Sequence, residues 1–157
     1  MGKIIRGSKS GQGLKFAVVV SFFNEHITSK LLEGCLEGFA ENGVNKEYIT
    51  VAWVPGSLEL GVVAKKMARS YKYDAIICLG AVIKGETSHY DIVANWGAYA
   101  MTQAALDTGI PVILGYLTTE NAEQAEARSG GLIGNKGYDA ALSGIEMANL
   151  MKNLDNY

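Results

Sequence analysis

Short apolar runs alternate with stretches of helical periodicity along this chain. Apolar runs bounded by turn signals predict four buried strands, at residues 14–21, 49–54, 74–79 and 112–117. Apolar side chains recur at helical spacing in the remaining segments, which predicts helices at residues 27–39, 58–67, 90–107, 121–127 and 138–152. A glycine-rich segment at residues 129–137 is expected to form a loop before the last helix.

The alternation of strands and helices favours a three-layer α/β/α fold on a four-stranded parallel sheet. Right-handed crossovers make such a sheet doubly wound and flavodoxin-like. Residues 1–12 are expected to form a short N-terminal edge strand, at residues 3–6, and a flexible connector. The length of 157 residues predicts one domain that covers the whole chain.

Ligands of parallel sheets bind where the strands end, which here gathers loops at residues 21–24, 55–59, 81–89 and 115–121. In the third loop Ser88 and Asp91 have the spacing of a capping box. A helix N-terminus offers free N–H groups to an anion, and His89 in the first turn can transfer protons. We therefore expect an active site here. The alternative is a solvated histidine after a loop that only turns the chain.

Composition narrows the range of functions. A net charge of −2 without a Lys/Arg run gives no reason to expect nucleic acid as a partner. No apolar span is long enough to cross a membrane, and a signal-peptide core is lacking, so we expect a cytoplasmic protein. Cys35 and Cys78 are expected to be buried free thiols, and no close pair of ligands predicts a metal site.

Several common motifs are absent. The chain has no phosphate-binding P-loop and no G-x-S-x-G nucleophile elbow. Its early glycines precede a strand, which is the wrong side for a dinucleotide fingerprint. Phe22-Phe23-Asn24 follows the first strand, and these residues suit stacking on a flat ring better than the phosphate of a flavin carrier. No cofactor is predicted.

Short motifs follow one another in a fixed order along most of the chain. They are Phe23-Asn24, VPGSLE at 54–59, GAVIKG at 80–85 leading to His89, TTEN at 118–121, Arg128, GNKG at 134–137 and ALSGIEMA at 141–148. Through them the chain resembles the lumazine synthase family from about residue 13 to residue 154. The resemblance implies a cofactor-free transferase of riboflavin biosynthesis. It joins 5-amino-6-(D-ribitylamino)uracil to 3,4-dihydroxy-2-butanone 4-phosphate and gives 6,7-dimethyl-8-ribityllumazine.

The resemblance also implies roles for individual residues. His89 matches the family's proton-transfer residue, and Arg128 matches the arginine that holds the phosphate of the ketone. Phe23 matches the aromatic residue that stacks on the pyrimidine. The remaining substrate-binding positions carried over are Ser57, Leu58 and Glu59 near the ribityl chain, Ala81, Val82 and Ile83 at the pyrimidine edge, Gly85, Glu86 and Thr87 on the phosphate loop, and Leu114 and Lys136.

Four positions depart from the family pattern. Lys84 stands where arginine is common, and a lysine cannot make a bidentate contact. Glu86 stands where a small residue is usual, so its carboxylate should point to solvent, away from a bound phosphate. Leu114 replaces a residue that is often aromatic. Trp96 replaces one that is often polar, and we expect it to pack between subunits.

Family members form pentamers in which neighbouring subunits share each site, and many build a cage of sixty chains. The resemblance thus implies small-molecule substrates and a homo-oligomer, with Leu114 and Arg128 supplied by the neighbour. It leaves open a cage and an association with riboflavin synthase. Two other functions are weighed: an archaeal-type riboflavin synthase, which does not need a butanone-phosphate clamp, and a non-catalytic flavin-binding or cage-forming scaffold.

Overall fold

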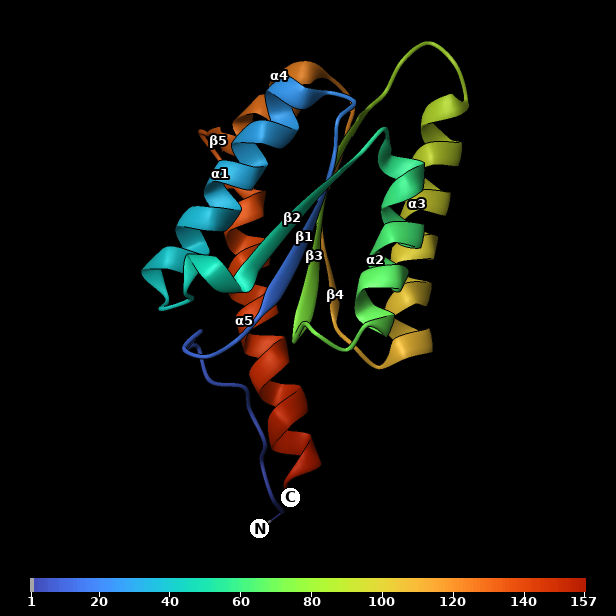
Figure 1. Cartoon of the computed structure of the whole chain (residues 1–157). Coiled ribbons are helices and arrows are strands. Elements are labelled where there is room, and N and C mark those ends of the chain that lie inside the picture. The colour runs from blue at the N-terminus through green and yellow to red at the C-terminus, as the bar shows by residue number, and fades with distance from the viewer. Residues whose placement is uncertain (1) are drawn as a thin grey trace.

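The computed structural model describes residues 2–157 and holds a four-stranded parallel sheet between two layers of helices (Figure 1). The strands lie in the order β2-β1-β3-β4. Their bounds are β1 Phe16–Ser21, β2 Ile49–Val54, β3 Ala75–Ile83 and β4 Val112–Thr119. The predicted α/β/α fold is confirmed, and β3 and β4 run further toward their carboxyl ends than the apolar runs indicate.

Residues 2–157 contain five α-helices and two short 3-10 turns, and the first three α-helices connect successive strands of the sheet. Helices α1 (Glu25–Glu41) and α5 (Lys136–Asp155) cover one face of the sheet, and α2 (Leu60–Arg69) and α3 (His89–Thr108) cover the other (Figure 1). The short α4 (Ala122–Ala127) follows β4. The 3-10 turns are η1 (Lys46–Tyr48) and η2 (Ser57–Glu59).

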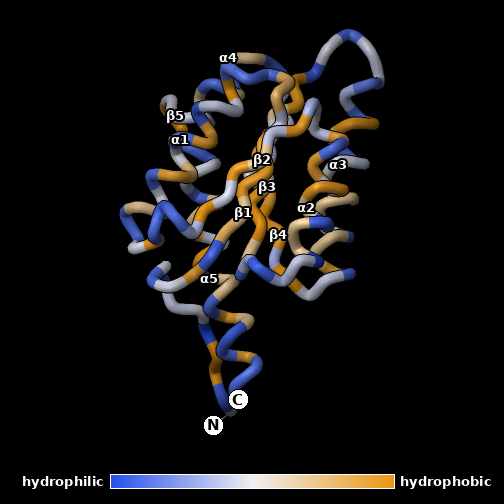
Figure 2. Tube along the Cα trace, in the orientation of Figure 1, coloured by the Kyte–Doolittle hydropathy of each residue, from blue (hydrophilic) through white to orange (hydrophobic). Residues whose placement is uncertain are grey.

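The strands are continuous apolar runs in the sequence because helices cover both faces of the sheet. The central strand β1 is buried at all six positions, because helices cover both of its faces. Phe16 stacks on Phe39 of α1, with ring centroids 4.4 Å apart, in the core beneath α1 and α5. Figure 2 shows the same distribution, with hydrophobic residues concentrated along the strands.

The N-terminal segment differs from the prediction. Residues 3–6 form no strand; the segment instead runs beside α5, and the two chain ends lie close together (Figure 1). Asn153 donates a hydrogen bond to the carbonyl of Arg6, and Asn149 donates to the carbonyls of Ser8 and Ser10. The edge strand predicted there is therefore wrong for this chain, because the side-chain amides of α5 bind the backbone that a strand would have paired.

Two further local predictions are corrected. The glycine-rich segment contains a small antiparallel hairpin, β5 (Ser129–Gly131) and β6 (Gly134–Asn135), rather than only a loop. The capping box is not formed either, because the side chain of Ser88 makes no capping hydrogen bond to α3. Within residues 2–157, no helix is both long and apolar enough to cross a membrane.

Candidate functional site

A cavity of about 460 Å³ lies at the carboxyl ends of β1, β2 and β3. We call it the loop cavity, because three of the four predicted loops line it. It brings together most of the residues that the sequence singles out. Its lining consists of Phe23, Asn24, Pro55, Gly56, Ser57, Leu58, Glu59, Ala81, Val82, Ile83, Gly85, Thr87, His89, Tyr90 and Val93.

Hydrogen bonds join the first loop to the second and to the third. The N–H of Phe23 donates to the carbonyl of Pro55 at 3.0 Å. Asn24 adopts a left-handed conformation, with φ 62° and ψ 42°, and its side-chain amide donates to the carbonyl of Ala81 at 2.8 Å. Asn24 is the N-cap residue of α1, but its side chain makes no capping bond. The Phe23 side chain is 70% exposed at the rim, which leaves its ring available to a flat ligand.

The end of β3 presents free backbone to the loop cavity. The pairing of β1 with β3 stops at Leu79, whereas the pairing of β3 with β4 continues to Ile83. The Lys84 N–H donates to Thr119 on β4, so the alternating residues Ala81 and Ile83 direct their backbone groups to the opposite side. No strand lies there, because β1 has already ended, although the Ala81 carbonyl accepts from Asn24. The Ala81 N–H and the backbone groups of Ile83 can therefore bind the polar edge of a planar ring.

The second loop supplies polar groups through η2. Ser57 is only 6% exposed, and Glu59 is half-buried where the chain enters α2. The Glu59 N–H donates to the carbonyl of Gly56, which holds the turn closed. A buried hydroxyl and a half-buried carboxylate two residues apart suit a ligand with several hydroxyl groups.

The third loop leads into α3 and carries His89. In place of the predicted capping box, the His89 N–H donates to the hydroxyl of Thr87 at 3.3 Å. Lys84 turns away to Glu120, with Nζ 3.6 Å from a carboxylate oxygen. Glu86 is exposed and does not line the cavity, whereas Gly85 and Thr87 do. The loop thus presents backbone and a hydroxyl to the cavity and keeps its carboxylate in solvent.

Arg128 and Lys136 lie in a different cavity of about 350 Å³ along β4. We call it the edge cavity. Arg128 ends α4, and its Nη1 donates to the carbonyl of Gln124 at 3.0 Å. The Lys136 N–H donates to the carbonyl of Arg128 at 2.8 Å, which keeps the two cations together beside Asp139. Its lining is Tyr116, Leu117, Thr118, Thr119, Gln124, Arg128, Ile133, Lys136 and Asp139.

Leu114 lies in neither cavity. It is partly buried on β4, packed with the apolar residues beneath α2 and α3. One chain therefore brings together ten of the fourteen predicted site residues in the loop cavity. Two more lie in the edge cavity, and Glu86 and Leu114 lie outside both.

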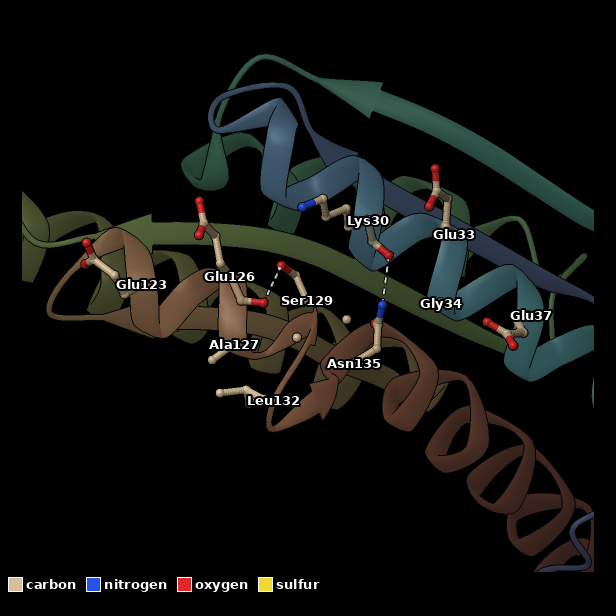
Figure 3. Close-up of a pocket in the computed structure, with 12 residues that line it drawn as sticks. Lys30, Glu33, Gly34, Glu37, Glu123, Glu126, Ala127, Ser129, Leu132 and Asn135 are labelled. Atoms are coloured by element: carbon tan, nitrogen blue, oxygen red, sulfur yellow. Dashed lines mark hydrogen bonds between the residues drawn. The ribbon is translucent and has the colours of Figure 1, made fainter.

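An open groove of about 590 Å³ between α1 and the β5–β6 hairpin holds none of the predicted site residues. Figure 3 shows Glu33 and Glu37 on α1, Glu123 and Glu126 on α4, and the hydrogen bond from Asn135 to the carbonyl of Lys30. Among residues 2–157, no cluster of three or more His, Cys, Asp or Glu side chains is placed to hold a metal ion.

Sequence reasoning missed five residues of the loop cavity as site residues. Asn24, Pro55 and Gly56 lie in the loops expected to bind ligand, but none of them was assigned a role in binding. Val93 lies four residues after His89 and so shares its side of α3, whereas Tyr90 is its direct neighbour in the chain. Helical spacing from His89 was the signal that could have identified Val93.

A comparison with known families gives one match that covers most of the chain. The model of a family described as 6,7-dimethyl-8-ribityllumazine synthase matches residues 13–152. The match includes every residue of the loop cavity and of the edge cavity.

Proposed function

The chain belongs to the 6,7-dimethyl-8-ribityllumazine synthase family, and from that premise we propose its substrates and the roles of its residues. It condenses 5-amino-6-(D-ribitylamino)uracil with 3,4-dihydroxy-2-butanone 4-phosphate to 6,7-dimethyl-8-ribityllumazine, phosphate and two water molecules. The observation that carries this proposal is the loop cavity, where an exposed aromatic ring, free strand backbone, a polar turn and an imidazole meet. We further propose that the chain acts as a single domain.

The pyrimidine substrate binds in the loop cavity. Its ring stacks on Phe23, and its polar edge meets the backbone groups of Ala81 and Ile83, with Val82 between them. The ribityl hydroxyls reach Ser57 and Glu59, and Leu58 covers the chain beside them. A carboxylate accepts several hydroxyl hydrogen bonds at once, so Glu59 selects a polyol over a shorter or less hydroxylated chain.

The ketone phosphate binds next to it, at the N-terminal end of α3. Backbone N–H groups around Gly85 and Thr87, with the positive end of the helix dipole, favour an anion. Glu86 contributes only its backbone here, because its side chain is exposed outside the cavity. Arg128 holds two phosphate oxygens with its guanidinium fork, and Lys136 adds a second positive charge.

His89 moves the protons of the reaction. The amine at carbon 5 of the pyrimidine attacks the ketone carbonyl, and His89 protonates the oxygen that departs as the first water, leaving an imine. His89 then removes a carbon-bound proton from the carbon next to the imine, and the C–O bond to phosphate breaks. Loss of phosphate leaves an enol, and its terminal CH2 takes up a proton to become a methyl group while the hydroxyl-bearing carbon becomes a carbonyl. The ribitylamino nitrogen closes the ring on this new carbonyl, and a second water leaves. Acid–base catalysis of this kind contributes about 10²–10⁴-fold.

Arg128 and Lys136 line a different cavity from His89, so we propose that each site forms between neighbouring copies. One copy supplies the loop cavity, and the next supplies Arg128, Lys136 and Leu114. A head-to-tail contact of this type closes into a ring, and we propose a pentamer. Exposed apolar residues on α3 support such a contact: Ile92, Trp96 and Tyr99 are 51%, 61% and 59% exposed. Trp96 and Tyr99 pack edge to face, with centroids 5.6 Å apart.

The test is the appearance of the lumazine by absorbance or fluorescence when purified protein receives both substrates. We expect product and phosphate in equal amounts, with neither formed when one substrate is omitted. A folded, assembled protein that yields no lumazine would overturn the proposal and favour a flavin-binding or cage-forming scaffold. Conversion of lumazine to riboflavin would favour the archaeal-type riboflavin synthase.

A further inference from the structure

The hydroxyl of Tyr116 on β4 is hydrogen-bonded to α3, which forms one wall of the loop cavity. Tyr116 is half-buried, with its ring packed in the apolar layer beneath α2 and α3. Its hydroxyl donates to the carbonyl of Val93 at 3.0 Å. Val93 lies one helical turn after His89, and both residues line the loop cavity, whereas Tyr116 does not. The hydroxyl can therefore influence the cavity only through the residues that it holds.

Two glycines make room for this ring. A Cβ atom at Gly97 of α3 would lie 2.6 Å from the Tyr116 hydroxyl oxygen. A Cβ atom at Gly80 of β3 would lie 3.0 Å from the ring and 3.1 Å from the Ser57 hydroxyl. A side chain at Gly97 would push the phenol hydroxyl away from α3, and one at Gly80 would crowd the ring against β3. The close approach of the hydroxyl to α3 therefore depends on glycine at position 97.

The hydroxyl remains a hydrogen-bond donor at neutral pH. Burial raises the pKa of Tyr116 to about 12. The bond to the Val93 carbonyl links the phenol to α3, so Tyr116 joins β4 to α3.

Few other side-chain hydrogen bonds hold the start of α3 in place. The N-cap residue Ser88 makes no side-chain capping bond, and residues 84–89 are all exposed. The hydroxyl of Thr87 contacts only the N–H of His89, over 3.3 Å. A helix end held this loosely needs an anchor if its first residue is to keep one position.

We propose that Tyr116 is a positioning residue for the reaction: its hydroxyl holds the first turns of α3, and with them His89, in a fixed place against β4. This inference rests on the proposed function. A catalytic imidazole that shifts by a fraction of an ångström loses alignment with the reacting atoms, so the anchor affects turnover more than substrate binding.

The test is a double-mutant cycle on lumazine formation with Tyr116→Phe, which removes one oxygen atom. Loss of this one hydrogen bond should lower kcat of Tyr116→Phe roughly three- to tenfold. We expect KM for both substrates to stay within about twofold of the wild-type values. In the His89→Ala background the same change should cost nothing further, because no imidazole is left to position. Tyr73→Phe is the matched control: its hydroxyl bonds Thr50 at 3.0 Å at the other end of the sheet, and its loss should leave kcat unchanged.

An unchanged kcat for Tyr116→Phe would overturn the inference, as would an equal loss in the wild-type and His89→Ala backgrounds. Failure of the proposed function has a different signature, because the wild-type protein would then form no lumazine. In that case hydrogen exchange decides: Tyr116→Phe should speed amide exchange in residues 89–97, and Tyr73→Phe should not. Equal exchange in the two variants would overturn the anchor itself.

Discussion

The loop cavity and the edge cavity differ in how they are built. The loop cavity is formed by three loops that hydrogen bonds hold together. The aromatic ring of Phe23, the backbone at the end of β3, the η2 turn and the imidazole of His89 all line it. The edge cavity lies along the outer strand of the sheet and holds Arg128 and Lys136 beside one carboxylate. One chain therefore has the groups that we propose for the pyrimidine and for proton transfer in one cavity and the cations that we propose for phosphate in another. The proposed reaction needs both sets, and in our proposal contact between two copies brings them together.

The largest effect is expected at the loop cavity. His89→Ala should slow lumazine formation by about 10²–10⁴-fold, because proton transfer is lost while both substrates are still aligned. Steady-state kinetics with both substrates measures this, and titration of the pyrimidine substrate should show unchanged binding. His26→Ala, which changes the only other histidine, an exposed one on α1, is the control and should keep full activity. A complete loss of activity with binding intact would contradict this division of labour.

A smaller effect of a different kind is expected at the edge cavity. Arg128→Ala should raise KM for the ketone phosphate by roughly 10- to 100-fold and leave KM for the pyrimidine unchanged, because a charge-assisted pair to phosphate is lost. Arg128→Lys should recover part of the loss, since it keeps the charge but not the fork. Lys30→Ala, which removes an exposed cation from the acidic groove, should have no effect. Equal changes in both KM values would show that Arg128 does not bind the phosphate alone.

Within the loop cavity, the pyrimidine side can be tested by itself. Glu59→Gln keeps the shape of the side chain but replaces a charged acceptor with a neutral one, so KM for the ribitylamino substrate should rise about tenfold. The KM for the ketone phosphate should not change. Glu33→Gln on the exposed side of α1 serves as the control for loss of one carboxylate. The same rise in both KM values would mean that Glu59 supports the fold of the cavity and not the ribityl chain.

The sequence predicts the loop cavity much better than the edge cavity, and the reason is physical. Strand ends and helix starts are local signals, so the loops around Phe23, Ser57 and His89 could be placed at one edge of the sheet from order alone. Arg128 carried no local signal for a ligand, since an arginine at the end of a short helix also serves the helix dipole. Only the family resemblance gave it a role.

Other parts of the structure depend on contacts that a local pattern does not contain. The N-terminal residues were predicted to form a strand, but Asn149 and Asn153, far along the chain, bind their backbone. Asn24 was placed correctly at the start of α1, yet its side chain contacts Ala81 instead of capping the helix. The burial of Cys35 and Cys78 was predicted and is confirmed, because apolar periodicity reports burial directly.

The smallest effect on the reaction is expected from the two thiols, which should affect stability instead. Burial raises the pKa of both Cys35 and Cys78 to about 12 from 9.0, so the folded state keeps them protonated. Their contribution to stability is fully present below about pH 9 and is lost as the pH rises toward 12. At about pH 10.5 the free energy of unfolding should be lower than at pH 8 by roughly 2 kcal/mol for each thiol, because the thiol ionises in the unfolded chain but not in the folded one.

Denaturant unfolding at the two pH values measures this loss. Replacing both thiols with Cys35→Ala and Cys78→Ala lowers stability at pH 8 because it leaves small cavities, but it should flatten the decline at high pH. The thiols lie in the cores on opposite faces of the sheet, so a single replacement should remove about half of the pH dependence. An equally steep decline in the double variant would assign the alkaline loss to other groups.

Complementation between inactive chains tests most directly whether each site is shared by two copies. Chains carrying His89→Ala and chains carrying Arg128→Ala are given different affinity tags, co-expressed and purified as mixed oligomers. If each site takes His89 from one copy and Arg128 from its neighbour, about one site in four regains both groups. Assayed with ketone phosphate well below the KM of Arg128→Ala, the mixture should then show about a quarter of wild-type activity, although each variant assembled alone is strongly impaired at that concentration. Activity no greater than the average of the two separate variants would contradict a shared site and place both groups in one chain.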